Sequence, residues 1–274
     1  MKKLFLIFVA VISAAVFMDS IGKSMPVMSE KRIPRDKASS GTAYGTPEVK
    51  IMSYNIHRGI NKNGRLDLDG IAEAVKGSGA EIIALQEVER FSFRTGFRDQ
   101  IKYLADKLSM QYVFGKSINI LNGQYGNGLL SIYPIEEYEV IRLYSEGEQR
   151  TLLKAVLNVD GTLLRVYNTH LGLSQEERDR QVEDIIKLAA EEENLIITGD
   201  FNTKADKLGA IAGKLTDSGG IEPDGEKATF EADGLSGRID YIFASKNFEI
   251  KGYEVLDTEA SDHYPVVSIL GINN

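Results

Sequence analysis

Apolar and polar residues follow two periods along most of the chain, and these predict strands and helices in mixed order. Apolar residues recur three and four positions apart over Leu68–Lys76 and Arg98–Leu108, as on one face of a helix. A third helix is expected over Ser174–Glu193, opened by a capping box in which Glu177 follows Ser174. Strands are expected over Val49–Asn55, Ile82–Leu85, Leu129–Tyr133, Tyr138–Leu143, Leu152–Val159, Leu163–Asn168, Leu195–Thr198, Ile239–Ala244, Glu249–Leu256 and Tyr264–Leu270.

The order of these elements fits neither a regular βαβ repeat nor an all-β protein. Asp160-Gly161 is a typical two-residue hairpin turn between two of the strands. No internal repeat interrupts the pattern. We therefore expect an α/β protein in which mixed sheets pack together, with helices outside them.

The N-terminal segment has a different pattern. Lys2 and Lys3 precede the uncharged apolar run Leu4–Met18, which as a helix would measure about 22 Å, short of the ~30 Å bilayer core. This pattern predicts a signal peptide over residues 1–18, cleaved near Ala15, or an uncleaved N-terminal anchor. The protein is then expected outside the cytoplasm, either secreted or tethered to a membrane.

Residues 19–47 lack apolar periodicity and predict a flexible linker, which leaves residues 48–274 as the folded domain. With 43% hydrophobic and 26% charged residues, the 274-residue chain can bury a sizeable core. Its formal net charge is -8, and the part from Glu48 onward carries 25 basic and 37 acidic residues. Such an acidic domain is poorly suited to tight, sequence-indifferent binding of phosphate backbones.

Residue types narrow the chemistry further. The chain has no cysteine, which excludes disulfides, thiolate catalysis, zinc fingers and iron–sulfur clusters. Carboxylates without thiolates favour a hard cation such as Mg²⁺, Mn²⁺ or Ca²⁺. A histidine held by a carboxylate can move protons near neutral pH.

Polar residues of these types gather at strand ends, where loops on a rigid scaffold carry function. All three histidines of the chain lie in these clusters. Each cluster alone also fits a plain structural role, for example a turn closed by its own Asp. The clusters are Ser53–His57, Gln86-Glu87, Asn168–His170, Gly199–Asn202, Arg238–Tyr241 and Ser261–His263.

Taken together, these clusters resemble the endonuclease/exonuclease/phosphatase superfamily, in the superfamily's order and from Val49 to about Leu270. The resemblance implies a four-layer α/β sandwich with two mixed central β-sheets flanked by helices. It also implies hydrolysis of a phosphate ester with Mg²⁺, or Mn²⁺ or Ca²⁺, as cofactor. The matching motifs are Tyr54-Asn55-Ile56, Gln86-Glu87-Val88, Asn168-Thr169-His170-Leu171, Gly199-Asp200-Phe201-Asn202, Ile239-Asp240-Tyr241-Ile242 and Ser261-Asp262-His263-Tyr264-Pro265-Val266.

By the same resemblance, Glu87 is the main metal ligand, with Asn55 beside it and Asp262 contributing. Arg150 and Asn127 match positions that contact the substrate phosphate, although a surface arginine and a turn asparagine would look the same in the sequence.

The implied catalytic group has five members. His263 is the essential imidazole, and Asp240 fixes its tautomer. His170 contacts the phosphate or assists the leaving group. Asp200 orients or deprotonates the attacking water, and Asn202 holds a phosphate oxygen. The formal base stays open between Asp200 and His263.

The substrate is left open, with a phosphodiester foremost. Relatives cleave nucleic acids, lipids, sugar phosphates and inositol phosphates, and a secreted nuclease or a catalytically inactive binding relative are the alternatives. No obligate protein partner is evident, and a monomer is expected. The segment 90–98 clusters three arginines with three phenylalanines, which predicts a substrate-facing loop or a partly buried aromatic loop with solvated arginines. The absence of tryptophan sets the chain apart from membrane-inserting sphingomyelinases.

Overall fold

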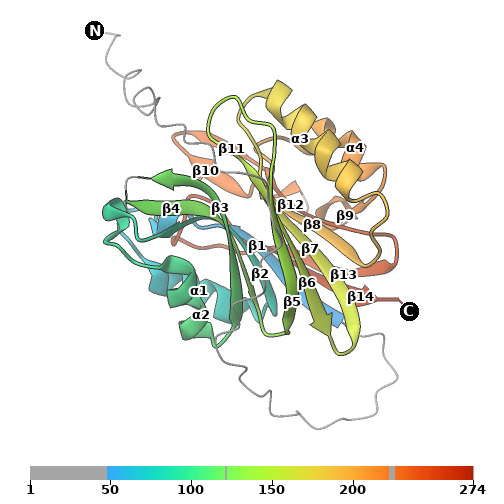
Figure 1. Cartoon of the computed structure of the whole chain (residues 1–274), viewed down its shortest axis with the longest axis horizontal. Coiled ribbons are helices and arrows are strands. Elements are labelled where there is room, and N and C mark those ends of the chain that lie inside the picture. Colours follow the sequence, from blue (N-terminus) through green and yellow to red (C-terminus); the bar gives the residue numbers. More distant parts are fainter. Residues whose placement is uncertain (1–47, 121, 222–225, 274) are drawn as a thin grey trace.

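Two six-stranded sheets lie face to face at the centre of the protein, with helices on their outer sides (Figure 1). The computed structural model describes residues 48–120, 122–221 and 226–273. The expected signal peptide or anchor and the expected linker, residues 1–47, lie outside this range. None of the helices in the described part of the chain combines the length and hydropathy needed to span a bilayer.

The first sheet has the strand order β13-β14-β1-β2-β4-β3. Its β1 and β2 run parallel, and its other neighbouring pairs are antiparallel, so the sheet is mixed. Its strands are β1 (Glu48–Asn55), β2 (Ile82–Arg90), β3 (Gln111–Ile120), β4 (Gly123–Ser131), β13 (Phe248–Val255) and β14 (Val266–Ile272).

The second sheet has the order β5-β6-β7-β8-β12-β9. Here β7 and β8 form the parallel pair. A separate hairpin of β10 (Phe230–Ala232) and β11 (Leu235–Gly237) stands beside it. The strands of the second sheet are β5 (Ile135–Arg142), β6 (Thr151–Val159), β7 (Thr162–His170), β8 (Leu195–Asp200), β9 (Thr216–Asp217) and β12 (Asp240–Ala244).

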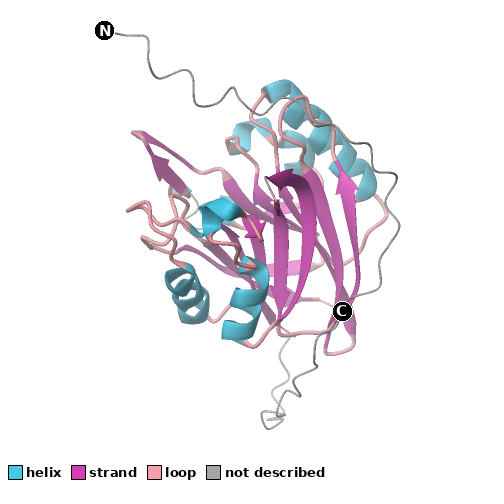
Figure 2. Cartoon of the chain, turned by 60° about the vertical axis from the view of Figure 1, so that its left-hand side comes forward, coloured by secondary structure: helices cyan, strands magenta, loops and turns pink. Residues whose placement is uncertain are grey.

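Alternation along the strands builds three apolar layers. In β1, Val49 and Ile51 face the second sheet, whereas Met52 and Tyr54 pack with the outer helices. Helices α1 (Leu68–Ser78) and α2 (Gln100–Leu108) cover the first sheet, and α3 (Gln175–Leu188) and α4 (Gly209–Ala212) cover the second (Figure 2). The expected four-layer α/β sandwich with two mixed central sheets is therefore confirmed.

Several elements have other bounds than expected; the strand expected over Ile82–Leu85, for example, continues to Arg90. The helix that opens at Ser174 ends at Leu188 and not near Glu193. Carboxylates at positions 191–193 oppose the negative end of the helix dipole, and Glu192 pairs instead with Arg165. The strand expected over Leu129–Tyr133 is β4, which begins earlier, at Gly123.

The apolar pattern did not predict β3. The β3–β4 pair contains glycines, which interrupt the pattern. A Cβ on Gly126 would lie 2.0 Å from the carbonyl oxygen of Gly115, so only glycine allows the two strands to approach at this point. The Asp160-Gly161 turn, by contrast, is confirmed, with φ of 50° and 97°.

The start of α3 holds the loop that carries Arg150. Ser174 caps the helix by accepting from the Glu177 backbone N–H, 3.1 Å away. The Glu177 carboxylate accepts in turn from the backbone N–H groups of Glu146 (2.7 Å) and Gly147 (3.3 Å). Burial pushes the pKa of Glu177 upward, but these hydrogen bonds outweigh it and hold the pKa below its ordinary value of 4.5.

Glu177 therefore predicts a pH-dependent contribution to stability. A lowered folded-state pKa stabilises the protein above about pH 4.5, and this contribution is lost as the pH falls through the folded-state value. Replacing Glu177 with glutamine should lower the melting temperature at neutral pH by several degrees, and the difference should shrink below about pH 4.5. Melting temperatures of the parent protein and of Glu177→Gln, measured from neutral pH to below pH 4.5, test this prediction. Glu176→Gln, at an exposed neighbouring carboxylate, should change little, and a pH-independent Glu177→Gln effect would contradict the prediction.

Candidate active site

The strand ends that carry the polar clusters meet at one edge of the sandwich. Because β1 and β2 are parallel, as are β7 and β8, Asn55, Glu87, His170 and Asp200 all lie at or near carboxyl ends of strands. Asp240 opens β12 directly opposite Asp200 in the antiparallel register. The tertiary structure thus brings together groups that are far apart in the chain.

Two buried amides join the sheets below this edge. The Gln86 side chain donates to Asn168 Oδ1 over 2.7 Å, from β2 to β7. The Asn168 side chain donates to the carbonyl oxygens of Leu85 (2.9 Å) and Gly128 (2.8 Å). These residues are fully buried, so they act as a rigid floor for the site.

Glu87 lies at an irregularity of β2. The pairing with β4 shifts between Leu85 and Val88, and Glu87 has a φ of 59°, unusual for a residue other than glycine. Bulges of this kind redirect a side chain beside functional sites. The Asn55 side-chain amide bridges two carboxylates, since it donates to Glu87 Oε1 at 3.2 Å and to Asp200 Oδ2 at 2.9 Å.

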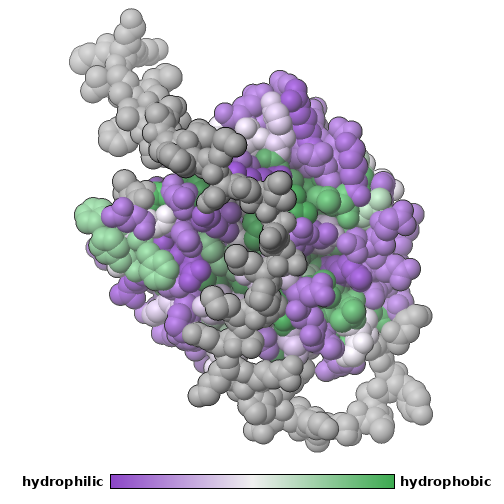
Figure 3. Space-filling view, viewed as in Figure 1, coloured by the Kyte–Doolittle hydropathy of each residue, from purple (hydrophilic) through white to green (hydrophobic). Residues whose placement is uncertain are grey.

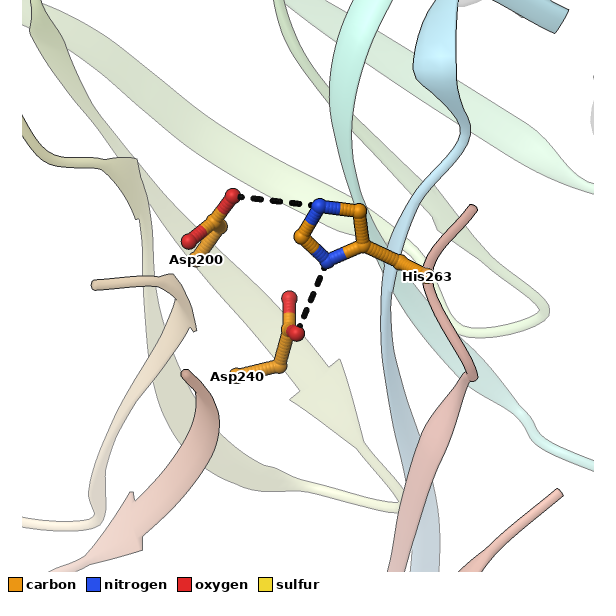
Figure 4. A group of neighbouring side chains, drawn as sticks. All are labelled: Asp200, Asp240 and His263. Atoms are coloured by element: carbon orange, nitrogen blue, oxygen red, sulfur yellow. Dashed lines mark hydrogen bonds and ion pairs between the residues drawn. The ribbon is translucent and has the colours of Figure 1, made fainter. Parts of the chain in front are cut away.

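His263 lies between two carboxylates, one on each side of its ring (Figure 4). Its Nδ1 is 2.9 Å from Asp240 Oδ2, and its Nε2 is 3.7 Å from Asp200 Oδ2. The same Asp240 oxygen accepts a hydrogen bond from the Thr229 hydroxyl over 2.6 Å. Thr229 Oγ1 also accepts from the backbone N–H groups of Ile239 and Asp240, each at 3.0 Å. The Asp240 carboxylate is therefore fixed from two directions.

Burial and mutual charge shift the protonation of this group. Burial alone would lower the pKa of His263, but the Asp240 and Asp200 carboxylates outweigh it and raise the pKa to about 10. Burial, with the Asp240 charge in addition, raises the pKa of Asp200 to about 7. Burial, Arg150 and His263 lower the pKa of His170 well below its usual range. At neutral pH His263 is a cation and His170 is neutral, with its Nε2 3.4 Å from Asp200 Oδ2.

Two sets of residues have the chemistry to hold a metal ion. Ligand atoms of Asp200, Asp240 and His263 lie within 4.8 Å of one another, and Asp240 Oδ1 is buried without a hydrogen-bond partner. In this set, however, His263 Nδ1 and Asp240 Oδ2 already bond to each other. The other candidate is the half-buried Glu87 carboxylate, whose oxygens are the ligands that a hard cation prefers. Asn55 adjoins it through its amide nitrogen, while Asn55 Oδ1 accepts from the His57 backbone N–H at 3.0 Å.

Asp262 lies at the same edge but faces another neighbour. Its Oδ1 is 3.5 Å from Nδ1 of His57, which is the remaining histidine. The hydroxyl of Ser261 links this segment to β1, because it donates to the carbonyl oxygen of Asn55 at 2.8 Å.

The two asparagines expected at the substrate phosphate brace loops. Asn202 donates its backbone N–H to Asp200 Oδ1 (2.9 Å) and its side-chain amide to the carbonyl oxygen of Leu171 (2.9 Å). Asn127 donates its side-chain amide to the carbonyl oxygen of Thr151 at 3.1 Å. Asn127 thereby supports the backbone next to Arg150.

Arg150 is buried and pairs with Glu148, with 2.8 Å between its guanidinium nitrogen and Glu148 Oε1. Burial raises the pKa of Glu148, with Arg150 opposing the rise and Glu87 adding to it. The Arg150 charge also lowers the pKa of His170, so Arg150 lies near that histidine.

The sequence patterns did not point to Glu148 or Thr229. Thr229 lies 11 residues before Asp240 in a segment without strand or helix periodicity. Glu148 lies in a polar loop that reads as solvent-exposed.

Comparisons with known proteins identify the family. Residues 52–263 match the Endonuclease/Exonuclease/phosphatase family. YbhP of Escherichia coli, an uncharacterized protein, is 30% identical over 171 residues, which cover 56% of this chain and 66% of YbhP. The 5'-tyrosyl-DNA phosphodiesterase of Caenorhabditis elegans is 24% identical over 234 residues, 79% of this chain and 59% of that protein. The chain thus spans less than two thirds of either relative.

A solved structure has the same fold. The endonuclease/exonuclease/phosphatase from Beutenbergia cavernae superposes with a TM-score of 0.73 at 23% identity, covering 83% of this chain and 72% of that one. The family includes phosphodiesterases, nucleases and phosphatases. Because the family match covers residues 52–263, the chain belongs to the Endonuclease/Exonuclease/phosphatase family.

Proposed function

We propose that the protein is a divalent-metal-dependent phosphodiesterase, in which water attacks phosphorus in line with the leaving oxygen. One observation carries the proposal: the His263 imidazole lies between Asp240 and Asp200, and Asn55 links Asp200 to Glu87. This arrangement supports the proposal, because a group able to transfer protons lies close to a carboxylate suited to a hard cation.

Glu87, with Asn55 beside it and Asp262 on the neighbouring loop, would hold the cation. Mg²⁺, Mn²⁺ and Ca²⁺ all fit a set of carboxylate and amide oxygens. When bound, the ion polarises a phosphoryl oxygen and neutralises charge on the leaving group. The bridging amide of Asn55 keeps the Glu87 and Asp200 carboxylates at a fixed distance from each other.

The remaining side chains would carry the proton and the phosphate charge. Asp200 takes a proton from the attacking water, because it is the carboxylate within reach of both His170 and His263. His263, oriented by Asp240, donates to a phosphoryl oxygen as negative charge develops there. Arg150 meets a second phosphoryl oxygen. Neutral His170 would donate a hydrogen bond from its ring to a phosphate oxygen. A water molecule would protonate the departing oxygen as the P–O bond breaks, and Asp200 would then release the proton it took to solvent.

Local charge favours a diester over a monoester. The described residues around the site include the carboxylates of Glu87, Asp200, Asp240 and Asp262, whereas Arg150 already pairs with Glu148. A singly charged diester meets less repulsion there than a doubly charged monoester. The phosphodiesterase named among the relatives supports the same choice. The leader pattern of residues 1–18 further supports activity outside the cytoplasm.

Removing divalent metal tests the proposal directly. EDTA should stop hydrolysis of bis-p-nitrophenyl phosphate, and Mg²⁺ or Mn²⁺ should restore it, because Glu87 and Asn55 need the ion to act on phosphate. p-Nitrophenyl phosphate should be cleaved much more slowly. Turnover that resists EDTA would contradict the metal assignment, and a faster monoesterase activity would contradict the diester assignment. Plasmid DNA and sphingomyelin, added to the same panel, distinguish a nuclease from a lipid hydrolase.

A further inference from the structure

Three phenylalanines are exposed on the loop between β2 and α2, which we call the aromatic loop (residues 91–98). Phe93 is 68% exposed, and Phe91 and Phe97 are about half exposed. The rings of Phe93 and Phe97 stack edge to face, 5.7 Å apart. Figure 3 shows pale green side chains gathered at the left-hand end of a mostly purple surface, over this loop. Contiguous exposed apolar groups of this kind mark an interaction surface.

The aromatic loop borders the active site. It begins four residues after Glu87. Its Arg94 binds the buried Glu89 of β2 and lies close enough to Glu148 to act on it electrostatically. A partner that covers this loop would therefore approach the space between Glu87 and Arg150.

The other exposed apolar side chains extend the same edge. Leu173 follows His170, Leu235 is in the β10–β11 hairpin whose Phe230 bridges to His263, and Leu66 follows β1. Among the described residues, the large exposed hydrophobic outside this edge is Leu163, in the β6–β7 hairpin at the opposite end. A broad surface laid across the catalytic edge would touch apolar tips from several loops at once.

The charge of the aromatic loop indicates which kind of partner surface it fits. Segment 90–98 holds three arginines and no acidic residue. Arg90 pairs with Asp99 and Arg94 with Glu89, while Arg98 lies over the Tyr103 ring, 5.7 Å from its centre. The loop and its ion-pair partners therefore keep a net positive charge. Cations beside projecting aromatic rings fit the headgroup layer of an anionic membrane.

We infer that the aromatic loop docks the protein on an anionic lipid bilayer, with the catalytic edge facing the membrane. Nucleic acid fits less well, because Arg90 and Arg94 are already paired with carboxylates, so few cations of the loop are left to contact a phosphate backbone. Phenylalanine supplies apolar area without the indole anchor of tryptophan, so the docking is shallow and reversible. The docking does not depend on hydrolysis and leaves the proposed function untouched if it fails.

The absence of tryptophan from the chain provides a position-specific test. Phe93→Trp in the full chain carries a single indole on the aromatic loop, and Leu163→Trp carries one at the opposite end. With vesicles of phosphatidylglycerol and phosphatidylcholine, Phe93→Trp emission should shift to shorter wavelength, and Leu163→Trp emission should not. The comparison holds even if the N-terminal apolar run binds the vesicles, because that run does not select between the two indoles.

Several results would overturn the inference. An unshifted Phe93→Trp, or equal shifts at both positions, would show that the loop does not enter the bilayer. Quenching by single-stranded oligothymidine without a response to vesicles would assign the loop to base stacking. A shift that grows with protein concentration alone would assign it to self-association. Changing Phe91 and Phe97 to serine in the Phe93→Trp protein should abolish most of its emission shift, and an unchanged shift would equally contradict the loop's role.

Hydrolysis provides the matching control. Phe93→Trp should cleave the water-soluble bis-p-nitrophenyl phosphate as fast as the parent protein. Glu87→Gln combined with Phe93→Trp should keep the vesicle response. Failure of docking and failure of catalysis are thus read separately.

Discussion

Replacing Glu87 with glutamine should lower kcat/KM for bis-p-nitrophenyl phosphate by about a thousandfold. Glutamine keeps the size of the side chain and an oxygen that can accept from Asn55, but it removes the charge that would hold the cation. The loss of several kcal/mol of transition-state stabilisation corresponds to this factor. Glu87 is half-buried and has an unusual backbone conformation. The melting temperature of the variant should therefore be measured together with its kinetics.

The matched control is Glu259→Gln, which removes a carboxylate that is 76% exposed and 4.0 Å from Lys62. It should melt like the parent protein and retain its activity. If Glu87→Gln melts normally and still hydrolyses the diester within tenfold of the parent protein, Glu87 is not the metal ligand. The Asp200, Asp240 and His263 set would then be the remaining choice for the cation.

Replacing His263 with alanine should lower kcat by about three to four orders of magnitude, because the imidazole is the group that donates to the phosphoryl oxygen. The change also leaves the buried Asp240 carboxylate with the Thr229 hydroxyl but without its cation. Stability should therefore fall as well, since an unpaired buried charge is costly.

A double variant separates the two effects. His263→Ala with Asp240→Asn removes the unpaired charge, so the melting temperature should recover in part while activity stays lost. Because the pair acts as one unit, the double variant should be about as slow as the single one. Restored turnover in the double variant, or near-parental turnover in a folded His263→Ala protein, would remove His263 from the mechanism.

Much of the site was predictable because the polar residues follow strands that the alternation of apolar residues identifies. Asn55, His170 and Asp200 end three such strands, and Asp240 begins another. What the pattern could not predict was Thr229, which lies outside any periodic element and contacts Asp240 across 11 residues. The β3–β4 pair was missed for a related reason, since its glycines allow close strand approach but interrupt the apolar pattern.

The sequence alone determined the order of most elements, the capped start of α3 at Ser174 and the residue types available for chemistry, because periodicity, capping and turns are local properties. The tertiary structure alone decided which groups meet. Asn55 and Asp200 bond across 145 residues, and His263 and Asp240 across 23. Such contacts depend on how two sheets pair and pack, and their free energy appears only when the distant segments are buried together. The same packing left the rings of the aromatic loop, which begins four residues after Glu87, exposed to solvent.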